Sequence, residues 1–561
     1  NIFHGNWESG IKFIDDFRLG DQSDAPDILK NNKGKNHYFF IPLLLGLIGL
    51  FYQFSRDKRG CWLTFLMFFM TGIAIVIYLN QPPYQVRERD YAYAGSFYFF
   101  SIWIGLAVAS VYMRLREILR RRYELPVAAA VAVLFLGAPA LMAEQNWDDH
   151  DRSGRRTAAE LAANYLNSVG PNGVIVTHGD NDTFPLWYAQ EVEGVRTDVR
   201  ICNTSLLGTD WHIDQMKYAV NESAPLDLQV GKRQYLYGTN EFVPIYDVRN
   251  EVMSIGDVMK LFRHPDVKVQ LGNGMKCDYI ASRRISVPVN RENAVRCGIV
   301  SEENADRIGD SILLVLPEGK DYVTKPELFL LDFLSTYQWD RPLHLLNMGG
   351  DLEIGQKDYL EYVGYSYRLI PFRNRPSTVD PGFVDTDELY RKMTEVFRWD
   401  ALSSDDYYVD YQNCYTFLGV SSVRQLFYVS AKKFHERGWD DRALGMLDKS
   451  FEVMKTSRYP IEAIPIGFSS NDYTVVRMID LYYKLGERDK ARRYGKELGD
   501  ELLRSVAFYM GFYDRGCRDE LETAVNYVMF LIETFNGNDD KDLAVEIASA
   551  ASKITGMSLG E

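Results

Sequence analysis

Long apolar segments separated by short polar loops dominate the first quarter of the chain. They run over about residues 37–54, 61–79, 95–113 and 126–143. Each approaches the roughly 20 residues that a helix needs to cross a bilayer. The pattern therefore predicts a bundle of four transmembrane helices over residues 37–143. Four core helices of a soluble protein are the alternative, which is disfavoured because such segments with charged flanks are hard to bury in any other way.

The charges of the loops predict the orientation of these helices. Residues 55–60 carry three basic residues against one Asp, and residues 114–123 carry five arginines against one Glu. By the positive-inside rule both loops are cytoplasmic. Residues 80–94, residues 1–36 and everything beyond Ala143 then lie on the opposite side. Residues 1–36 are expected to form an extracytoplasmic segment on the membrane surface, with an apolar patch at Ile11, Phe13, Ile14 and Phe17.

From residue 144 onward, predicted strands alternate with predicted helices. This alternation is typical of a largely parallel sheet, so residues 144–410 are expected to form a soluble α/β domain with an irregular insertion at about 221–305. The expected strands are 172–178, 198–203, 311–316, 343–348 and 362–370. The expected helices are 183–193, 210–219 and 326–337.

The last part of the chain, residues 411–561, is predicted to be a helical, repeat-like domain resembling tetratricopeptide hairpins. Gly438-Trp-Asp-Asp-Arg-Ala443 recurs as Gly486-Glu-Arg-Asp-Lys-Ala491. At each copy a Gly closes one helix, an acidic residue opens the next and an Ala packs at the crossing. The copies are 486 − 438 = 48 residues apart, more than the about 34 of a tetratricopeptide repeat. The loop 456–470 is expected to absorb the difference.

Composition narrows the class of partner. The 561 residues carry a formal net charge of −14, and the soluble part is acidic. Nucleic-acid-binding surfaces are basic, so a nucleic acid partner is excluded. The six cysteines show no paired spacing of the kind that binds zinc. Two free thiols are favoured over a disulfide between Cys277 and Cys297, which an oxidising compartment would permit.

The loop 80–94 is the first candidate site, because a loop this short between two spans stays at the level of the lipid headgroups. Arg87 and Arg89 present planar guanidinium groups that suit a phosphate or pyrophosphate. Glu88 and Asp90 could orient these arginines, bind a divalent cation or act as a general base. Tyr91 suits the membrane interface. An interfacial loop whose charges pair with one another and with headgroups is the alternative.

The second candidate site is His178-Gly-Asp-Asn-Asp-Thr-Phe-Pro185, at the carboxyl end of a predicted strand, where ligands bind in open α/β sheets. Asp182 is expected to cap the following helix, whose amino terminus attracts anions. Asp180, Asn181 and Asp182 could hold a metal or sugar hydroxyls, and Trp187 could line a carbohydrate surface. A tight turn with ordinary capping residues is the alternative, and it is favoured modestly. His212 could act as a base, although a lone His is more often structural.

Three stretches resemble a known family of large Bacteroidetes membrane proteins, domain-of-unknown-function family 2723. The family is also classed as glycosyltransferase family 117, or protein O-mannosyltransferase-like. The stretches are Asn80-Gln-Pro-Pro-Tyr-Gln-Val-Arg-Glu-Arg-Asp-Tyr-Ala-Tyr-Ala-Gly-Ser-Phe97, His178-Gly-Asp-Asn-Asp-Thr-Phe-Pro-Leu-Trp-Tyr-Ala-Gln-Glu-Val-Glu-Gly194 and Asn203-Thr-Ser-Leu-Leu207. The resemblance spans at least residues 20–215.

The resemblance implies a GT-C-type enzyme that uses a polyprenyl-phosphate-linked sugar on the periplasmic side of the bacterial inner membrane. In such enzymes an acidic residue deprotonates an acceptor hydroxyl, which attacks the anomeric carbon in line while the lipid phosphate leaves. The chain begins at Asn1 without an initiator Met. We therefore expect it to be the carboxyl-terminal part of a longer polypeptide whose amino-terminal half carries that acid.

The expected function is transfer of a sugar to protein Ser or Thr, with the lipid donor, the acceptor protein and the bilayer as partners. Arg87 and Arg89 would then steady the departing phosphate. The alternative is a non-catalytic, membrane-tethered periplasmic scaffold that binds envelope or secreted proteins through its helical hairpins. A periplasmic hydrolase that uses Asp180 and Asp182 is a third, more distant hypothesis.

Overall fold

The computed structural model describes twelve stretches of the chain and groups them into two compact units. The described residues are 8–20, 22, 25–81, 89–118, 123–247, 250–272, 274–348, 352–377, 380–409, 420–461, 471–512 and 517–556. The first unit comprises Asn1–Arg155, Ser404–Gln425 and Met454–Glu561, and the second comprises Arg156–Ser403 and Leu426–Val453. Each unit is described by itself below.

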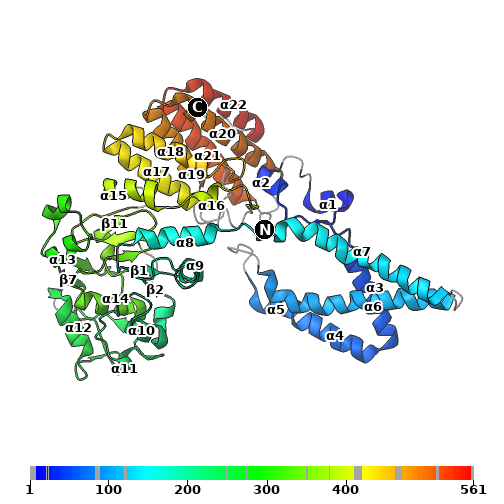
Figure 1. Cartoon of the computed structure of the whole chain (residues 1–561), viewed down its shortest axis with the longest axis horizontal. Coiled ribbons are helices and arrows are strands. Elements are labelled where there is room, and N and C mark those ends of the chain that lie inside the picture. The colour runs from blue at the N-terminus through cyan, green and yellow to red at the C-terminus, as the bar shows by residue number, and fades with distance from the viewer. Residues whose placement is uncertain are drawn as a thin grey trace. The chain divides into compact units, whose positions relative to one another are not determined.

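Apolar helices make up the amino-terminal part of the first unit (Figure 1). They are α3 (Ile41–Arg56), α4 (Lys58–Met70), α5 (Ile73–Leu79), α6 (Ala94–Ile118) and α7 (Glu124–His150). Among the described residues, three stretches are long and apolar enough to cross a membrane: Lys58–Leu79, Tyr91–Ile118 and Glu124–His150. Of the four predicted spans, the first corresponds to α3, an apolar helix of 16 residues that is shorter than the other three. Two short helices, α1 (Lys12–Leu19) and α2 (Asp27–Lys30), precede them.

Glycine brings α3 and α6 into close contact. A Cβ added at Gly49 would lie 1.7 Å from the carbonyl oxygen of Trp103, and one at Gly46 would lie 2.1 Å from the ring of Phe100. The indole N–H of Trp103 donates a hydrogen bond of 2.7 Å to Gln53 on α3. Small residues at such crossings let helix backbones approach, which is the usual packing of helices in lipid.

A five-stranded mixed sheet lies in the second unit, in the order β11-β12-β10-β1-β2. Figure 1 labels β11, β1 and β2 of this sheet. Its strands are β1 (Val174–Thr177), β2 (Arg200–Asn203), β10 (Leu343–Leu345), β11 (Leu360–Tyr362) and β12 (Tyr367–Leu369). β1 pairs in parallel with β10 and β2, whereas β12 pairs antiparallel with β10 and β11. The single strand expected at 362–370 is therefore a hairpin, whose turn contains Gly364 at φ +105°.

The two faces of this sheet differ in chemistry. The register sets Glu361, Arg368, His344, Ile175 and Ile201 opposite one another, one from each strand. Directly paired residues point to the same face, so this row lies on one face. On this face Ile175 and Ile201, at the apolar end of the row, pack on α8 (Thr157–Ser168) and α9 (Asp180–Glu191). The opposite face carries Val174, Val176 and Cys202 into the larger apolar core.

Smaller sheets occupy the region after β2. A three-stranded sheet has the order β4-β7-β8, so the strand predicted at 311–316 belongs to this sheet and not to the five-stranded one. The strands are β3 (Phe242–Pro244), β4 (Val252–Ser254), β5 (Val269–Gln270), β6 (Lys276–Cys277), β7 (Arg284–Pro288), β8 (Ser311–Val315) and β9 (Tyr322–Thr324). Further helices are α10 (Asp210–Met216), α11 (Lys232–Tyr235), α12 (Ile255–Arg263), α13 (Arg291–Arg296), α14 (Lys325–Thr336), α15 (Thr386–Arg391), the π-helical turn η7 (Lys392–Val396) and α16 (Asp400–Ser403). Cys277 and Cys297 are free thiols.

Helices form the carboxyl-terminal part of the chain. They are α17 (Val420–Glu436), α18 (Asp440–Val453), α19 (Asn471–Lys484), α20 (Arg488–Gly511), α21 (Arg518–Gly537) and α22 (Lys541–Thr555). Gly438 and Gly486 both adopt φ +81°, as expected of glycines that close helices. The amide after each donates to a carbonyl five residues earlier, Trp439 to Phe434 at 2.8 Å and Glu487 to Tyr482 at 2.9 Å. This pattern is the Schellman motif.

A third junction of this type joins α21 to α22, and the sequence repeat did not reveal it. Asp539 stands where the other two junctions have Gly and adopts φ +55°. The amide of Asp540 donates to the carbonyl of Phe535 at 2.8 Å, again five residues earlier. Ala544 is buried, as Ala443 and Ala491 are at the equivalent places.

Candidate functional site

The structure describes only part of the loop 80–94. Arg87 and Glu88 lie outside the described residues. Residues Asp90–Tyr93 form the 3₁₀ turn η2, which leads directly into α6. The Arg89 side chain is exposed, and among the residues that the structure describes it has no hydrogen-bond or ion-pair partner. Tyr91 is 61% exposed. An exposed guanidinium thus stands at the amino-terminal end of an apolar helix.

A polar network closes the carboxyl end of β1 and β2. The hydroxyl groups of Thr177 and Thr183 lie 2.6 Å apart, and the Asn203 side-chain amide donates to Thr183 Oγ1 at 2.8 Å. The Ser205 hydroxyl donates to the carbonyl of His178 at 2.8 Å. Thr177, Thr183 and Asn203 are fully buried. The network fixes the turn between β1 and α9 against the turn after β2.

The first turn of α9 carries the predicted site residues of this edge. Asp180 and Asn181 are exposed, and Asp182 is half-buried. The expectation that Asp182 caps the helix is wrong. Gly179, in an extended conformation, occupies the cap position, and α9 begins at Asp180, three residues earlier than expected. Both Asp side chains lie in the first turn, where the helix dipole stabilises negative charge.

Aromatic side chains surround this edge. Phe184 and Trp187 stack with ring centroids 5.4 Å apart. Phe184, Tyr188 and Trp211 are 49%, 45% and 47% exposed. Trp187 also lines a small cavity of about 90 Å³, together with His212 and Gln215 of α10. Exposed aromatic rings beside carboxylates can pack on the apolar face of a sugar while acidic oxygens accept its hydroxyl protons.

His212 is a structural residue. It is 1% exposed, and its Nε2 accepts a hydrogen bond of 3.3 Å from the backbone N–H of Asn203. Burial lowers the pKa of His212 to about 4. A neutral imidazole already engaged by the backbone is not available as a base, so the structure argues against the catalytic role considered from sequence.

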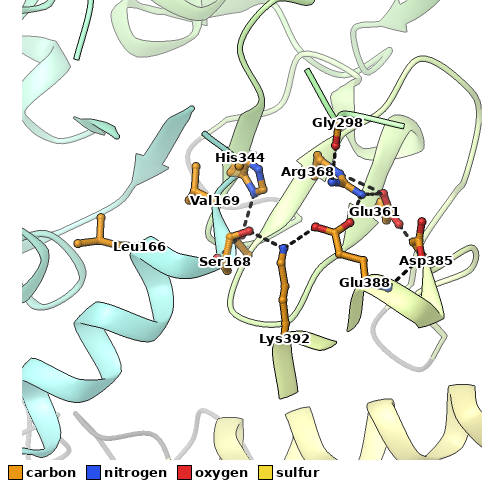
Figure 2. Close-up of polar contacts among 12 residues, drawn as sticks. Leu166, Ser168, Val169, Gly298, His344, Glu361, Arg368, Asp385, Glu388 and Lys392 are labelled. Atoms are coloured by element: carbon orange, nitrogen blue, oxygen red, sulfur yellow. Dashed lines mark hydrogen bonds and ion pairs between the residues drawn. The ribbon is translucent and has the colours of Figure 1, made fainter. Parts of the chain in front are cut away.

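A second cluster of charged residues, not foreseen from sequence, lies on one face of the sheet (Figure 2). Arg368 donates to Glu361 at 2.8 Å and to Glu388 of α15 at 2.8 Å, and also to the carbonyl of Gly298 at 3.0 Å. Lys392 of η7 forms an ion pair of 2.9 Å with Glu388 and donates to the carbonyl of Ser168 at 2.7 Å. We call Glu361, Arg368, Glu388 and Lys392 the buried ion cluster. The only sequence signal was a charge inside each of two apolar strands.

The cluster balances its own charge. Two carboxylates face two cations, and the side chains of Arg368, Glu361 and Lys392 are 4%, 2% and 5% exposed. Burial raises the pKa of Glu361. Burial also acts to raise the pKa of Glu388, but Arg368 and Lys392 outweigh it and hold that pKa well below its usual value. A neutral, enclosed cluster of this kind orders the fold and offers no surface to a substrate.

His344 extends the row beyond the cluster. The Ser168 hydroxyl donates to the carbonyl of Tyr165, so its oxygen accepts the hydrogen bond from the Ser366 hydroxyl. The Ser366 oxygen in turn accepts a hydrogen bond from the Nδ1–H of His344. His344 Nε2 then carries the lone pair, and this buried atom has no hydrogen-bond partner among the residues that the structure describes. Burial lowers the pKa of His344 well below its usual value. The arrangement is a serine–histidine chain sealed inside the core, with no exposed nucleophile.

Within the described ranges, no group of three or more His, Cys, Asp or Glu side chains is placed to hold a metal ion.

Comparison with known proteins finds a family model that matches part of the chain. Residues 158–388 match the model of TMEM260-associated domain 2. The match runs from α8 into α15 and contains both the sheet edge and most of the buried ion cluster. No curated protein and no solved structure matches the chain.

Proposed function

We propose that this chain works in a membrane glycosyltransferase that moves a sugar from a polyprenyl-phosphate donor to Ser or Thr of an acceptor protein. The observation that carries the proposal is the match of residues 158–388 to TMEM260-associated domain 2, which points to a membrane glycosyltransferase-like protein. This domain follows three helices long and apolar enough to cross a membrane. The resemblance of residues 80–97, 178–194 and 203–207 to glycosyltransferase family 117 supports the same reaction class.

The side of the membrane on which transfer takes place follows from charge. Arg114 and Arg116, at the carboxyl-terminal end of α6, have side chains 80% and 51% exposed. Basic residues flanking a span favour the cytoplasmic side. The loop 80–94 at the other end of α6 then faces outward. In a bacterium this proposal puts the donor loop on the outer face of the inner membrane and the two soluble domains in the periplasm.

The loop supplies the groups that receive the lipid phosphate. Arg87 and Arg89 hold the phosphate as it departs, because guanidinium groups bind phosphate through paired hydrogen bonds. The exposed Arg89 and the positive end of the dipole of α6 both favour an anion there. Glu88 and Asp90 orient the arginines, hold a divalent cation, or take the acceptor proton. Tyr91 anchors the loop at the interface.

The sheet edge recognises the hydroxyl-bearing substrate. Asp180, Asn181 and Asp182 accept and donate hydrogen bonds to sugar or acceptor hydroxyls, and Trp187 with its exposed aromatic neighbours packs against their apolar faces. This role is supported by the exposure of these groups at the carboxyl end of parallel strands, where open sheets bind ligands.

The test measures sugar transfer from a polyprenyl-phosphate donor to an acceptor peptide in reconstituted membranes. Arg87→Ala/Arg89→Ala is expected to lower transfer by about 100-fold, the cost typical of removing charge stabilisation from a reaction centre. Arg114→Lys/Arg116→Lys is the control, since it replaces two arginines at the opposite end of the same helix and keeps the positive charge that sets the orientation of the helix. Unchanged transfer in the first variant, with correct membrane insertion, would leave the loop without a catalytic role and favour the scaffold hypothesis.

A further inference from the structure

A cavity of about 650 Å³ lies within the first unit, apart from the sheet edge of the second unit. Its wall combines the last turn of α7 and the turn that follows it, the residues after Ser404, the loop after Met454, and α20. Every lining residue belongs to that one unit. The volume is in the range of pockets that hold small organic ligands. Nothing in the function proposed above uses this cavity.

Aromatic rings are presented to the cavity. Trp147, near the end of α7, is 77% exposed, so its ring is accessible to a ligand. Tyr408 is fixed beside it in the lining, because its hydroxyl accepts the backbone N–H of Lys33 at 3.1 Å. Such rigid rings are platforms for the apolar face of a ligand.

Hydrogen-bond acceptors outnumber donors around these rings. Six carboxylates line the cavity against two cations, Lys33 and Arg458. Within the part of the chain that the structure describes, the carboxylates of Asp406 and Glu497 have no hydrogen-bond or ion-pair partner. Ionised carboxylates only accept hydrogen bonds. The ligand must therefore bring donors, which excludes a phosphate or another anion.

The two cations argue against a basic ligand. Lys33 Nζ lies 4.9 Å from the centroid of the Tyr408 ring, and the Arg458 guanidinium lies 5.0 Å from that of Tyr407. These two cations pair with cavity carboxylates, Lys33 with Asp148 at 3.5 Å and Arg458 with Asp405 at 3.6 Å, and they already occupy the ring faces on which an incoming ammonium or guanidinium group would stack. A neutral molecule with many hydroxyl groups meets no such competition.

We propose that this cavity binds a neutral saccharide, with Trp147 stacking on a sugar ring and Glu497 accepting hydroxyl protons. Consecutive membrane spans alternate in direction, so the end of α7 and the loop 80–94 would lie on the same side of the membrane. A saccharide bound here is therefore on the side where the proposed transfer takes place. The binding chemistry stands on the cavity alone and does not require that reaction.

The test uses the full chain in detergent micelles, with mannobiose, maltotriose and chitotriose as probes and saturation-transfer NMR plus titration calorimetry as readouts. At least one probe is expected to bind saturably and to protect the Trp147 indole from solvent quenching. Trp147→Ala and Glu497→Gln should each weaken that binding by about tenfold, a factor set by one aromatic or one charged contact. Asp500→Asn is the matched control, because Asp500 lies one turn further along α20, is exposed and does not line the cavity.

Two outcomes would overturn the proposal. One is the absence of saturable binding by all three saccharides, and the other is binding that neither Trp147→Ala nor Glu497→Gln changes. Saturable binding of pentalysine at this cavity, lost in Glu497→Gln, would assign it to basic peptides instead. Sugar transfer is measured separately. Absent saccharide binding with intact transfer would refute only the proposed saccharide site. Absent transfer with intact saccharide binding would refute only the proposed transferase function.

Discussion

Arg368 is the residue whose removal tests the interpretation of the buried ion cluster most directly. Its guanidinium donates to Glu361 through Nε at 3.2 Å and Nη2 at 2.8 Å, and to Glu388 at 2.8 Å. In Arg368→Met, Glu361 keeps only the backbone N–H of Asp385 at 2.8 Å, inside a site where its side chain is 2% exposed. Glu388 keeps Lys392 and is 26% exposed. The uncompensated charge is therefore mainly that of Glu361.

Removing one partner of a buried ion pair costs about 3–5 kcal/mol, and we expect Arg368→Met to destabilise the sheet by that amount. The matched control is Arg373→Met. Arg373 also forms a two-pronged contact with a carboxylate, donating to Asp358 at 3.1 and 2.9 Å, but the two side chains are 52% and 38% exposed. An exposed pair of this kind contributes about 0–1 kcal/mol. Arg368 therefore differs from Arg373 in its burial and in its further contacts with Glu388 and the carbonyl of Gly298.

Native-state hydrogen exchange of the full chain measures the effect, because amides of β10 and β12 report the opening of the sheet itself. Adding Glu361→Gln to Arg368→Met should restore about 1–3 kcal/mol, since the buried charge is then gone. The deficit of the single variant should also shrink as the pH falls. Its Glu361 has a raised pKa in the folded state, so the folded state takes up a proton before the unfolded state does. Equal costs for Arg368→Met and Arg373→Met would refute this reasoning.

Three further expectations follow from other contacts. Gly49→Ala should destabilise the packing of α3 on α6 by about 1–3 kcal/mol, because the added Cβ meets the Trp103 carbonyl. Thermal unfolding in detergent measures the effect. The control is Gly105→Ala on α6, where an added Cβ meets no atom within 4 Å. Burial lowers the pKa of His212 from 6.5 to about 4. Because the unfolded chain takes up a proton that the folded state does not, the folded state should lose about 2 kcal/mol of stability as the pH falls from about 7 to about 5. Hydrogen exchange at β2 should show that loss, and unchanged protection would contradict it. Residues 486 and 539 both adopt positive φ, which Gly tolerates better than other residues. Gly486→Ala should therefore destabilise its junction by about 1 kcal/mol, whereas Asp539→Gly should stabilise the third junction. Calorimetry of the two variants should show unfolding temperatures shifted in opposite directions.

Features set by local pattern were the predictable part of this fold. Uncharged apolar segments longer than a core helix marked the three long helices, and the repeated Gly438 and Gly486 marked helix ends found at φ +81°. The third junction was missed because Asp539 replaces Gly at the left-handed position. The hairpin at 360–369 was mistaken for one strand, although Gly364 was an available turn signal.

Features set by distant contacts were not predictable. Glu361 precedes the strand expected at 362–370 and Arg368 lies within it, and only the pairing of β12 with β10 and β11 and the arrival of α15 bury the two side chains together. At the sheet edge, Asp182 was taken for a cap because capping preferences are local. Gly179 instead occupies the cap position, and Asp182 lies inside the first turn of α9.

The charged row across the sheet also constrains which pairings its hairpin can adopt. Side chains alternate between the two faces along a strand. Sliding β12 by one residue against β10 would therefore turn Arg368 into the apolar core on the other face. Glu361 would then be left without its counterion. A slip that costs little in an all-apolar strand would here bury two opposite charges in separate compartments. The same charged residues whose removal destabilises the sheet thus also disfavour every other alignment of its hairpin.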